Sequence, residues 1–236
     1  MYQMQKFICR SNFIKSQENF DILFYECLFD SSVFKNSLFQ QLKIHFPDKI
    51  RLAVNIRKAE FLAGRFCAKK CLRELNIKDF EIKADNNRCP MWPPGLNGSI
   101  THSKSMAIAA VSSQSSVLGV GIDIEDIISS VTISETIEQV MYGREFSLFD
   151  TSDVSREVLF SLVFSIKESF FKAAYPSTGY YFGFDAVRIN SLDFLKNRFE
   201  LTLLQDLNPL LIKGYIYTGY FKLMHNQIFS ILVIKN

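Results

Sequence analysis

The order of its periodic segments constrains the fold of this chain more than any other feature of the sequence. Apolar side chains recur at three- and four-residue steps from about residue 49 to residue 76, which predicts one long helix that begins beside Pro47 and Asp48. Three short strand-like runs follow, at residues 98–102, 106–112 and 117–125. The polar stretch 112–116 predicts a hairpin between the last two of these runs.

The second half of the chain also combines a helix with strands. Apolar positions trace one helical face from residue 154 to about residue 174, and Pro176 and Gly179 are expected to end this helix. Strand-like runs follow at residues 185–189, 199–204, 215–223 and 227–234. We therefore expect an α+β fold of two lobes with mainly antiparallel sheets, an N-terminal lobe over 1–118 and a C-terminal lobe over 119–236.

Composition narrows the class of protein. With 236 residues, 48% of them apolar and 22% charged, the chain can bury a sizeable core and is too apolar to be disordered. Its 27 basic and 24 acidic residues give a net charge of only +3, far from the strong positive charge that is typical of nucleic-acid-binding proteins. We therefore expect no nucleic-acid partner.

The chain also lacks the signals of membrane insertion and of oxidative folding. No apolar run approaches the roughly 20 residues of a membrane-spanning helix, and the polar residues 11–19 argue against a secretory signal. The five cysteines show no Cys-x-x-Cys spacing, which argues against a zinc ribbon and against a disulfide framework. We expect reduced thiols, no membrane span and a cytoplasmic location.

A strand with two carboxylates on one face is the first candidate for chemistry. In the run 120–125, the two-residue period of a strand places Asp123 and Glu125 on one face and the apolar residues on the other. Neighbouring carboxylates repel each other, and a hard cation such as Mg²⁺ would relieve the repulsion. The alternative is an ordinary amphipathic strand with a solvated acidic face.

A charged pair on the second predicted helix is the next candidate. Glu168 and Lys172 are four positions apart, so their side chains meet on one face of the helix. Most pairs of this kind are surface ion pairs that contribute a few tenths of a kcal/mol. Neither segment is decisive on its own.

Together, the two segments resemble the paired signature of the 4′-phosphopantetheinyl transferases. This signature is a Gly-Ile-Asp strand followed by a helix with the pattern aromatic-Ser-x-Lys-Glu-Ser-x-x-Lys, and the chain has Gly121-Ile122-Asp123 and then Phe-Ser-Ile-Lys-Glu-Ser-Phe-Phe-Lys over 164–172. Phe164 stands where many members have tryptophan. Three upstream segments resemble the surfactin/enterobactin-synthetase branch of the family, at residues 57–65, 88–93 and 98–103.

The resemblance implies a reaction and a set of catalytic residues. Members transfer the phosphopantetheine arm of coenzyme A to a serine of an apo carrier protein and release adenosine 3′,5′-bisphosphate. Asp123, Glu125 and Glu168 would hold Mg²⁺, or Mn²⁺ in its place, against the pyrophosphate. Glu168 matches the proposed general base, and Lys172 could pair with the α-phosphate or assist the leaving group.

The resemblance also implies which residues bind the nucleotide end of coenzyme A. Arg57 and Arg65 are eight residues apart, about two helical turns, so both fall on nearly the same side of the first helix. Arg88 and the pair Thr101-His102 match further phosphate- and nucleotide-contacting positions. The family fold implies two similar, pseudo-twofold-related lobes with the ligand cleft between them.

The partners that follow from the resemblance are coenzyme A and apo peptidyl, aryl or acyl carrier domains. The pathway would be siderophore or other nonribosomal peptide biosynthesis, and we expect a monomer. Two other classes of protein stay open at this point. One is a non-enzymatic coenzyme A or carrier-protein binding module of the same fold, against which the intact acidic set of motif residues argues. The other is a nucleotide-binding protein for RNA, which only the arginines favour.

Overall fold

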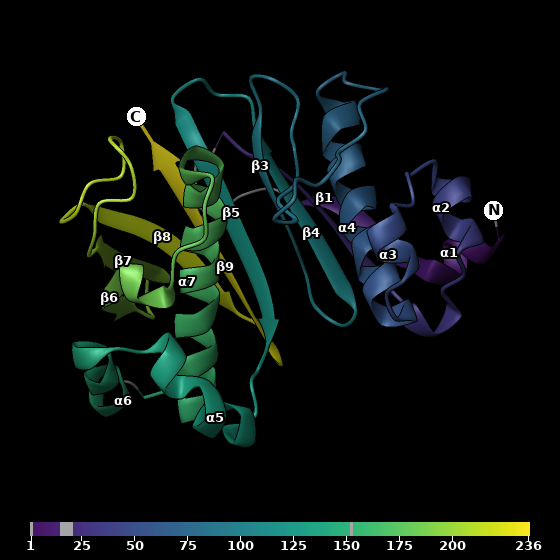
Figure 1. Ribbon diagram of the computed structural model, residues 1–236. Helices are drawn as coiled ribbons and strands as arrows, with labels where there is room; N and C mark the ends of the chain where they lie inside the picture. Colours follow the sequence, from purple (N-terminus) through teal and green to yellow (C-terminus); the bar gives the residue numbers. More distant parts are fainter. Residues whose placement is uncertain (1, 15–20, 152) are drawn as a thin grey trace. The chain divides into compact units, whose positions relative to one another are not determined.

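The computed structural model describes residues 2–14, 21–151 and 153–236, and these residues form two compact units that divide between Ser115 and Ser116 (Figure 1). Each unit packs helices against an antiparallel sheet, so the predicted α+β class is confirmed. The expected lobe boundary at 118/119 falls just inside the first strand of the second unit, β5 (Val117–Asp126). In the described part of the chain, no helix combines the length and the apolarity that crossing a bilayer requires.

The first unit is built on a four-stranded antiparallel sheet in the order β1-β2-β4-β3. Its elements are, in chain order, α1 (Tyr2–Phe7), β1 (Ile8–Ile14), β2 (Leu23–Phe29), the 3₁₀ turn η1 (Ser31–Val33), α2 (Ser37–Leu42), α3 (Asp48–Arg51), α4 (Asn55–Glu74), β3 (Asn97–His102) and β4 (Met106–Ser112). Helix α4 lies on the sheet and contributes Leu62, Cys67 and Leu72 to the core of the unit. A side chain at Gly64 would meet Ile100 at 2.7 Å, so glycine lets α4 approach strand β3 closely.

The single helix expected over 49–76 is two helices. Helix α3 ends at Arg51 and α4 starts at Asn55, after Val54 turns to an extended conformation with φ −67° and ψ 156°. Pro47 stands at the start of α3 as predicted. The apolar spacing of the sequence continues through Leu52 and Val54, but both side chains are exposed. Burial against the core therefore does not stabilise a helix there, and the helix is interrupted.

The second unit is built on a five-stranded antiparallel sheet in the order β5-β9-β8-β7-β6. The elements that follow β5 are α5 (Ser130–Val140), the 3₁₀ turn η2 (Gly143–Ser147), α6 (Leu148–Thr151), α7 (Arg156–Thr178), the 3₁₀ turn η3 (Phe184–Ala186), β6 (Val187–Asp193), β7 (Arg198–Leu203), β8 (Ile216–Leu223) and β9 (Gln227–Lys235). Helix α7 crosses β5 and β9 (Figure 1), and its apolar residues join those of the sheet in one buried core.

The hairpin predicted at 112–116 is wrong, because β4 and β5 belong to different sheets. Strand β4 is a central strand whose two edges are already paired with β2 and β3. No hydrogen-bonding edge is left for β5, which pairs with β9 instead. The polar stretch therefore connects the two units.

The predicted end of the second helix also needs correction. Pro176 lies inside α7, which continues to Thr178 and ends where Gly179 takes the left-handed conformation with φ 72°. Pro176 has no amide hydrogen to donate to the carbonyl of Lys172, four residues earlier, but the helix continues for only two residues beyond it. At the other end, the Ser155 hydroxyl accepts a hydrogen bond from the Val158 amide at 3.3 Å and caps the helix.

Candidate functional site

Strand β5 presents one face to helix α7, and this face carries the two carboxylates that the sequence placed together. A side chain at Gly121 would meet the Ser169 carbonyl oxygen at 1.8 Å, so the backbones of strand and helix touch there. Asp123 is two positions further along the same face and is only 2% exposed. The alternative of a solvated acidic face is therefore wrong for Asp123, because α7 covers it.

An ion pair joins the two predicted motifs. The Lys172 ammonium Nζ lies 2.5 Å from Asp123 Oδ1, and Lys172 is 27% exposed. Burial lowers the pKa of Lys172, but the negative charges of Asp123 and Glu168 raise it by more than burial lowers it. The pKa of Lys172 therefore lies above its usual value. The ammonium is thus held positive beside the carboxylates.

The other two carboxylates belong to the same cluster. Burial, with the repulsion of Asp123, raises the pKa of Glu125 to about 8. Burial also raises the pKa of Glu168, while Lys172 lowers it and Asp123 raises it. We name Asp123, Glu125, Glu168 and Lys172 the acidic cluster; it brings together every catalytic and metal residue that the sequence predicted.

The donors of the acidic cluster suit a hard divalent cation in kind. Three carboxylates supply only oxygen ligands, and burial together with the charge of Asp123 raises the pKa of both Glu125 and Glu168. Within the described ranges, however, no three His, Cys, Asp or Glu side chains converge closely enough to hold a metal as they stand. A cation would therefore require side-chain rotation, with Lys172 leaving Asp123.

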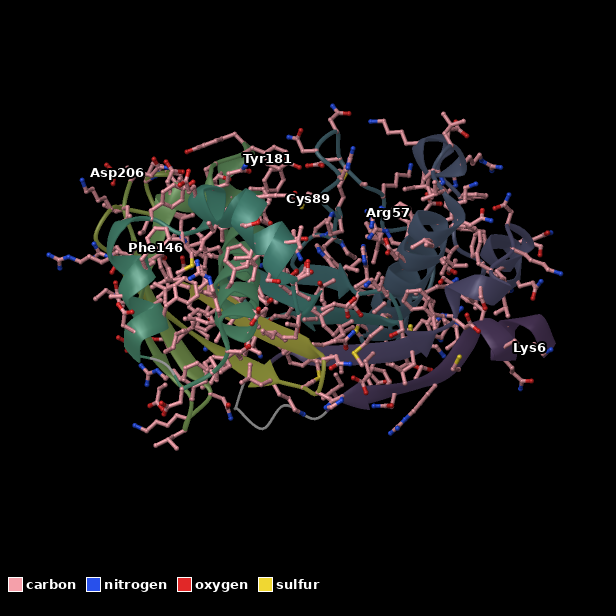
Figure 2. All side chains as sticks on the ribbon, turned by 90° about the horizontal axis from the view of Figure 1, so that it is seen from below. Lys6, Arg57, Cys89, Phe146, Tyr181 and Asp206 are labelled. Atoms are coloured by element: carbon pink, nitrogen blue, oxygen red, sulfur yellow. The ribbon has the colours of Figure 1, made fainter. Side chains whose placement is uncertain are left out.

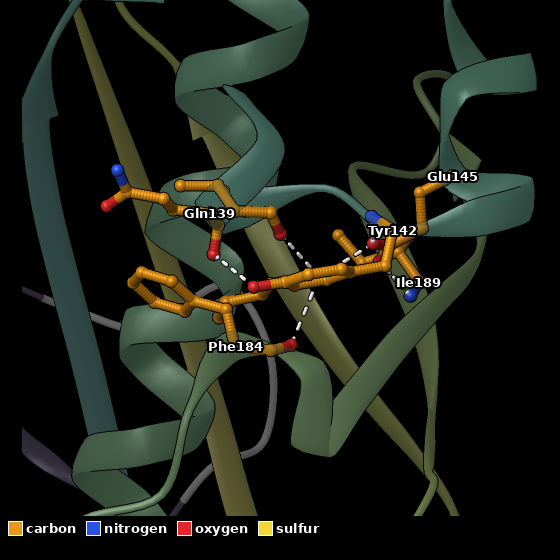
Figure 3. Close-up of polar contacts among 7 residues, drawn as sticks. Gln139, Tyr142, Glu145, Phe184 and Ile189 are labelled. Carbon is orange, nitrogen blue, oxygen red and sulfur yellow. Dashed lines mark hydrogen bonds and ion pairs between the residues drawn. The ribbon is translucent and has the colours of Figure 1, made fainter. Parts of the chain in front are cut away.

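A buried clamp that sequence reasoning missed holds the same helix from its other side (Figure 3). Lys167, next to Glu168 in the chain, lies 2.7 Å from Glu145, and both side chains are fully buried. Lys167 also donates to the Val140 carbonyl at 2.7 Å, and Glu145 accepts from the amides of Tyr142 at 2.9 Å and Ile189 at 2.7 Å. Because each charge is paired and hydrogen-bonded, the clamp fixes α7 against η2 and β6.

In the first unit, a second group of predicted residues lies together. Arg57, on α4 (Figure 2), contacts His102 Nε2 on β3 at 2.5 Å and Glu60 at 3.2 Å. His102 Nδ1 lies 3.6 Å from the same Glu60 carboxylate. Glu60, which the sequence did not single out, therefore orients both Arg57 and His102.

Arg65 lies on the same helix and is nearly buried, at 8% exposed. Its guanidinium stacks over the Phe61 ring at 4.8 Å, and its Nε has no hydrogen-bond partner among the described residues. Burial lowers the pKa of Arg65 to about 10, and the nearby Arg57 also lowers it, so at neutral pH the group stays charged. A buried, charged donor without a partner is suited to an anion.

The remaining predicted residues of this unit differ in their burial and do not form one group. Thr101 is buried on β3 at 3% exposed, next to His102. Arg88 is exposed in a turn and has a positive φ of 71°. Trp92 packs over Gly98, where a side chain would meet its ring at 2.6 Å, so Trp92 is a packing residue.

Comparisons with known proteins show which family this chain is similar to. A family model described as the 4′-phosphopantetheinyl transferase N-terminal domain matches residues 46–112, and one described as the 4′-phosphopantetheinyl transferase superfamily matches residues 119–218. Enterobactin synthase component D of Salmonella typhi is 34% identical over 194 residues, which cover 82% of this chain and 79% of the relative. The 4′-phosphopantetheinyl transferase Npt of Nocardia iowensis is 30% identical over 153 residues, 64% of this chain and 67% of the relative.

Proposed function

Because this chain belongs to the 4′-phosphopantetheinyl transferase superfamily, we propose that it transfers the 4′-phosphopantetheine group of coenzyme A to a serine of an apo carrier protein. Adenosine 3′,5′-bisphosphate is the other product. The observation that carries the proposal is the Lys172–Asp123 ion pair within a cluster whose other members, Glu125 and Glu168, have raised pKa values. Shifted carboxylates around a fixed ammonium are what transfer of a charged phosphoryl group requires.

Each member of the acidic cluster has a distinct role in this proposal. Glu168 accepts the proton of the carrier serine, because its raised pKa makes it a better base than an ordinary carboxylate. Asp123, Glu125 and Glu168 would hold Mg²⁺ or Mn²⁺, which supplies charge neutralisation of the pyrophosphate when bound. Lys172, released from Asp123, neutralises charge on the α-phosphate or the leaving group.

The first unit binds the nucleotide end of coenzyme A in this proposal. Arg57, Arg65 and His102 present positive or hydrogen-bonding groups from neighbouring elements, and Arg65 is held by its stack on Phe61. Arg88 and Thr101 are the remaining nucleotide contacts that the motifs suggest. The 3′-phosphate is the natural partner of Arg65, because a dianion compensates a buried guanidinium best.

Replacing Arg65 by alanine is expected to raise the Michaelis constant for coenzyme A by roughly ten- to hundredfold. A charge-assisted contact to phosphate contributes about 1.5–3 kcal/mol, and the side chain is otherwise unpartnered at Nε. The loss should be much smaller with dephospho-coenzyme A. Arg73→Ala, at the exposed end of the same helix, is the control. Equal losses with both substrates would place Arg65 elsewhere than at the 3′-phosphate.

Coenzyme A and Mg²⁺ are expected to bind with positive coupling. The negative charge of the acidic cluster repels a neighbouring pyrophosphate unless a cation is present, so each ligand should raise the affinity of the other by the same factor. Calorimetric titration of coenzyme A with and without Mg²⁺ measures that factor. The substitution Glu125→Gln should reduce this coupling factor more than it reduces the affinity for coenzyme A without metal. Identical affinities for coenzyme A with and without Mg²⁺ would refute a shared metal.

The carrier and the setting follow from the relatives. Component D relatives are named for enterobactin synthase, so peptidyl and aryl carrier domains of a siderophore or other nonribosomal peptide synthetase are the proposed partners. Activity should be tested with a panel of apo peptidyl, aryl and acyl carriers, because acyl carriers present the same reactive serine. We propose that the protein acts as a monomer in the cytoplasm.

Release of adenosine 3′,5′-bisphosphate separates this proposal from the non-enzymatic alternative. With coenzyme A, Mg²⁺ and an apo carrier, chromatography should detect the nucleotide product in step with consumption of coenzyme A. A binding module of the same fold would bind coenzyme A without releasing the bisphosphate. That outcome, with each carrier of the panel, would favour the alternative.

A further inference from the structure

Three buried serines join helix α7 to strand β9 beside the acidic cluster. Ser165 and Ser169 of α7 both reach Ser230 of β9, with oxygen–oxygen distances of 2.8 and 2.7 Å. Ser230 Oγ also donates to the Ser165 carbonyl at 2.9 Å, and all three side chains are fully buried. We name these residues the serine cluster.

The serine cluster lies directly next to the groups that carry the proposed chemistry. Ser165 and Ser169 flank Glu168 on α7, three positions before it and one after it. Ser230 is paired with Asp123 in the β5–β9 register, so its side chain lies on the same face of the sheet, under α7. The hydroxyls thus link the helix that carries Glu168 to the neighbour of Asp123.

The hydrogen bonds of the cluster are mutually consistent. A serine hydroxyl has one hydrogen and can accept twice. Because Ser230 donates its one hydrogen to the Ser165 carbonyl, it can only accept from the two helix hydroxyls, and the Ser169 hydroxyl also donates to the Ser230 carbonyl at 3.2 Å, so none of the three groups is left unsatisfied. A fully satisfied buried network is directional and specifies one arrangement of the elements that it joins.

The glycine contacts and the apolar packing between α7 and the sheet do not by themselves set the position of the helix along the strands. Gly119 and Gly121 let the helix backbone touch β5, but they offer no side chain that would stop it from sliding. The apolar residues of α7 pack in the common core, where the hydrophobic effect is non-directional. Beside the clamp at Lys167 and the ion pair of Lys172 with Asp123, the serine hydroxyls are the directional contacts that fix the register of α7 on β9.

We infer that Ser230, with Ser165 and Ser169, is a positioning residue that sets the distance of Glu168 and Lys172 from Asp123. The inference rests on the proposed function for its consequence in catalysis. A displacement of about 1 Å at a reacting centre costs up to roughly 10²-fold in rate, so a hydroxyl network one residue away matters to turnover. Substrate affinity depends on other residues and should change little.

Removing all three hydroxyls together separates positioning from folding. Ser230→Ala alone leaves two buried hydroxyls with fewer partners, which destabilises the fold in any case. The triple variant Ser165→Ala/Ser169→Ala/Ser230→Ala leaves no unsatisfied group, so its melting temperature should return close to that of the unchanged chain. Ser161→Ala is the matched control, because Ser161 lies on the same helix but outside the serine cluster. Its buried hydroxyl accepts a hydrogen bond from the Ile128 amide at 2.8 Å.

Reactivity of two lysines reports the position of α7 without any substrate or metal. In the folded chain Lys172 is paired with Asp123 and 27% exposed, whereas Lys167 is fully buried in its clamp with Glu145. In the triple variant, labelling of Lys172 by acetic anhydride should rise several-fold while Lys167 stays protected. Turnover should fall at least about tenfold, with the Michaelis constant for coenzyme A within about twofold.

The outcomes decide between the alternatives. A folded triple variant with unchanged Lys172 labelling and turnover would overturn the inference and leave the serines as core filler. Should the triple variant expose Lys167 as well, Ser169→Ala decides, because it keeps the Ser165–Ser230 bonds. In this variant Lys172 must be labelled faster while Lys167 stays protected, with a smaller loss of turnover. Labelling and turnover equal to those of Ser161→Ala would overturn the inference. If the unchanged chain itself transfers no phosphopantetheine, the proposed function fails separately.

Discussion

Glu168→Gln is expected to lower turnover by roughly 10² or more while the chain stays folded. The carboxamide has nearly the same shape, but at neutral pH it cannot accept the proton of the carrier serine. In the unchanged chain, the raised pKa of Glu168 means that this carboxylate holds a proton more tightly than an ordinary glutamate, which suits a general base. Initial rates with saturating coenzyme A and apo carrier measure the loss.

A glutamate on the same helix provides the control for this variant. Glu157 lies eleven residues before Glu168, about 16 Å along the helix axis, so Glu157→Gln should retain turnover. If raising the Mg²⁺ concentration restores the rate of Glu168→Gln, the carboxylate serves only as a metal ligand. That result would contradict its role as the base.

Gly121→Ala is expected to destabilise the second unit and abolish transfer. The added methyl would lie 1.8 Å from the Ser169 carbonyl oxygen and 2.7 Å from the Ala173 amide nitrogen, both of which are backbone atoms that no rotamer can move. Overpacking of this kind typically costs 1–3 kcal/mol, and we expect about 3 kcal/mol or more here. Urea unfolding gives the loss of stability, and the transfer rate in the native range gives the loss of function.

Gly183→Ala is the matched control for the glycine prediction. Its nearest neighbour is the flexible Asp185 carboxylate at 2.4 Å, and its φ of −80° suits any residue. It should therefore cost much less. If Gly121→Ala melts and turns over like Gly183→Ala, the close contact between α7 and β5 does not hold the acidic cluster.

Strong local patterns made part of this arrangement predictable. The run of strand β4 was predicted with its bounds at Met106 and Ser112, and the helix that carries Glu168 was predicted to within two residues at its start. Strand β4 is buried on both faces and so reads as a continuous apolar run, whereas the buried face of α7 repeats at the helical period. The motif residues on β5 and α7 were singled out by strand alternation and by the spacing of four residues on a helix, and the family resemblance suggested their roles.

What the sequence could not predict depends on contacts between distant residues. Alternation on β5 separates two faces but does not say which one a helix covers, so a solvated acidic face stayed open for Asp123, which is buried under α7. Lys167 and Glu145 are paired across 22 positions, with no local pattern to link them. Gly121 carried a usable signal, since glycine inside a strand often marks a close backbone approach.

The mass of a carrier domain tests the central claim most directly. An apo peptidyl carrier incubated with this protein, coenzyme A and Mg²⁺ should gain one phosphopantetheinyl group by intact-protein mass spectrometry, and a carrier whose acceptor serine is replaced by alanine should gain none. An unchanged mass for peptidyl, aryl and acyl carriers alike, under conditions where coenzyme A is bound, would contradict the account.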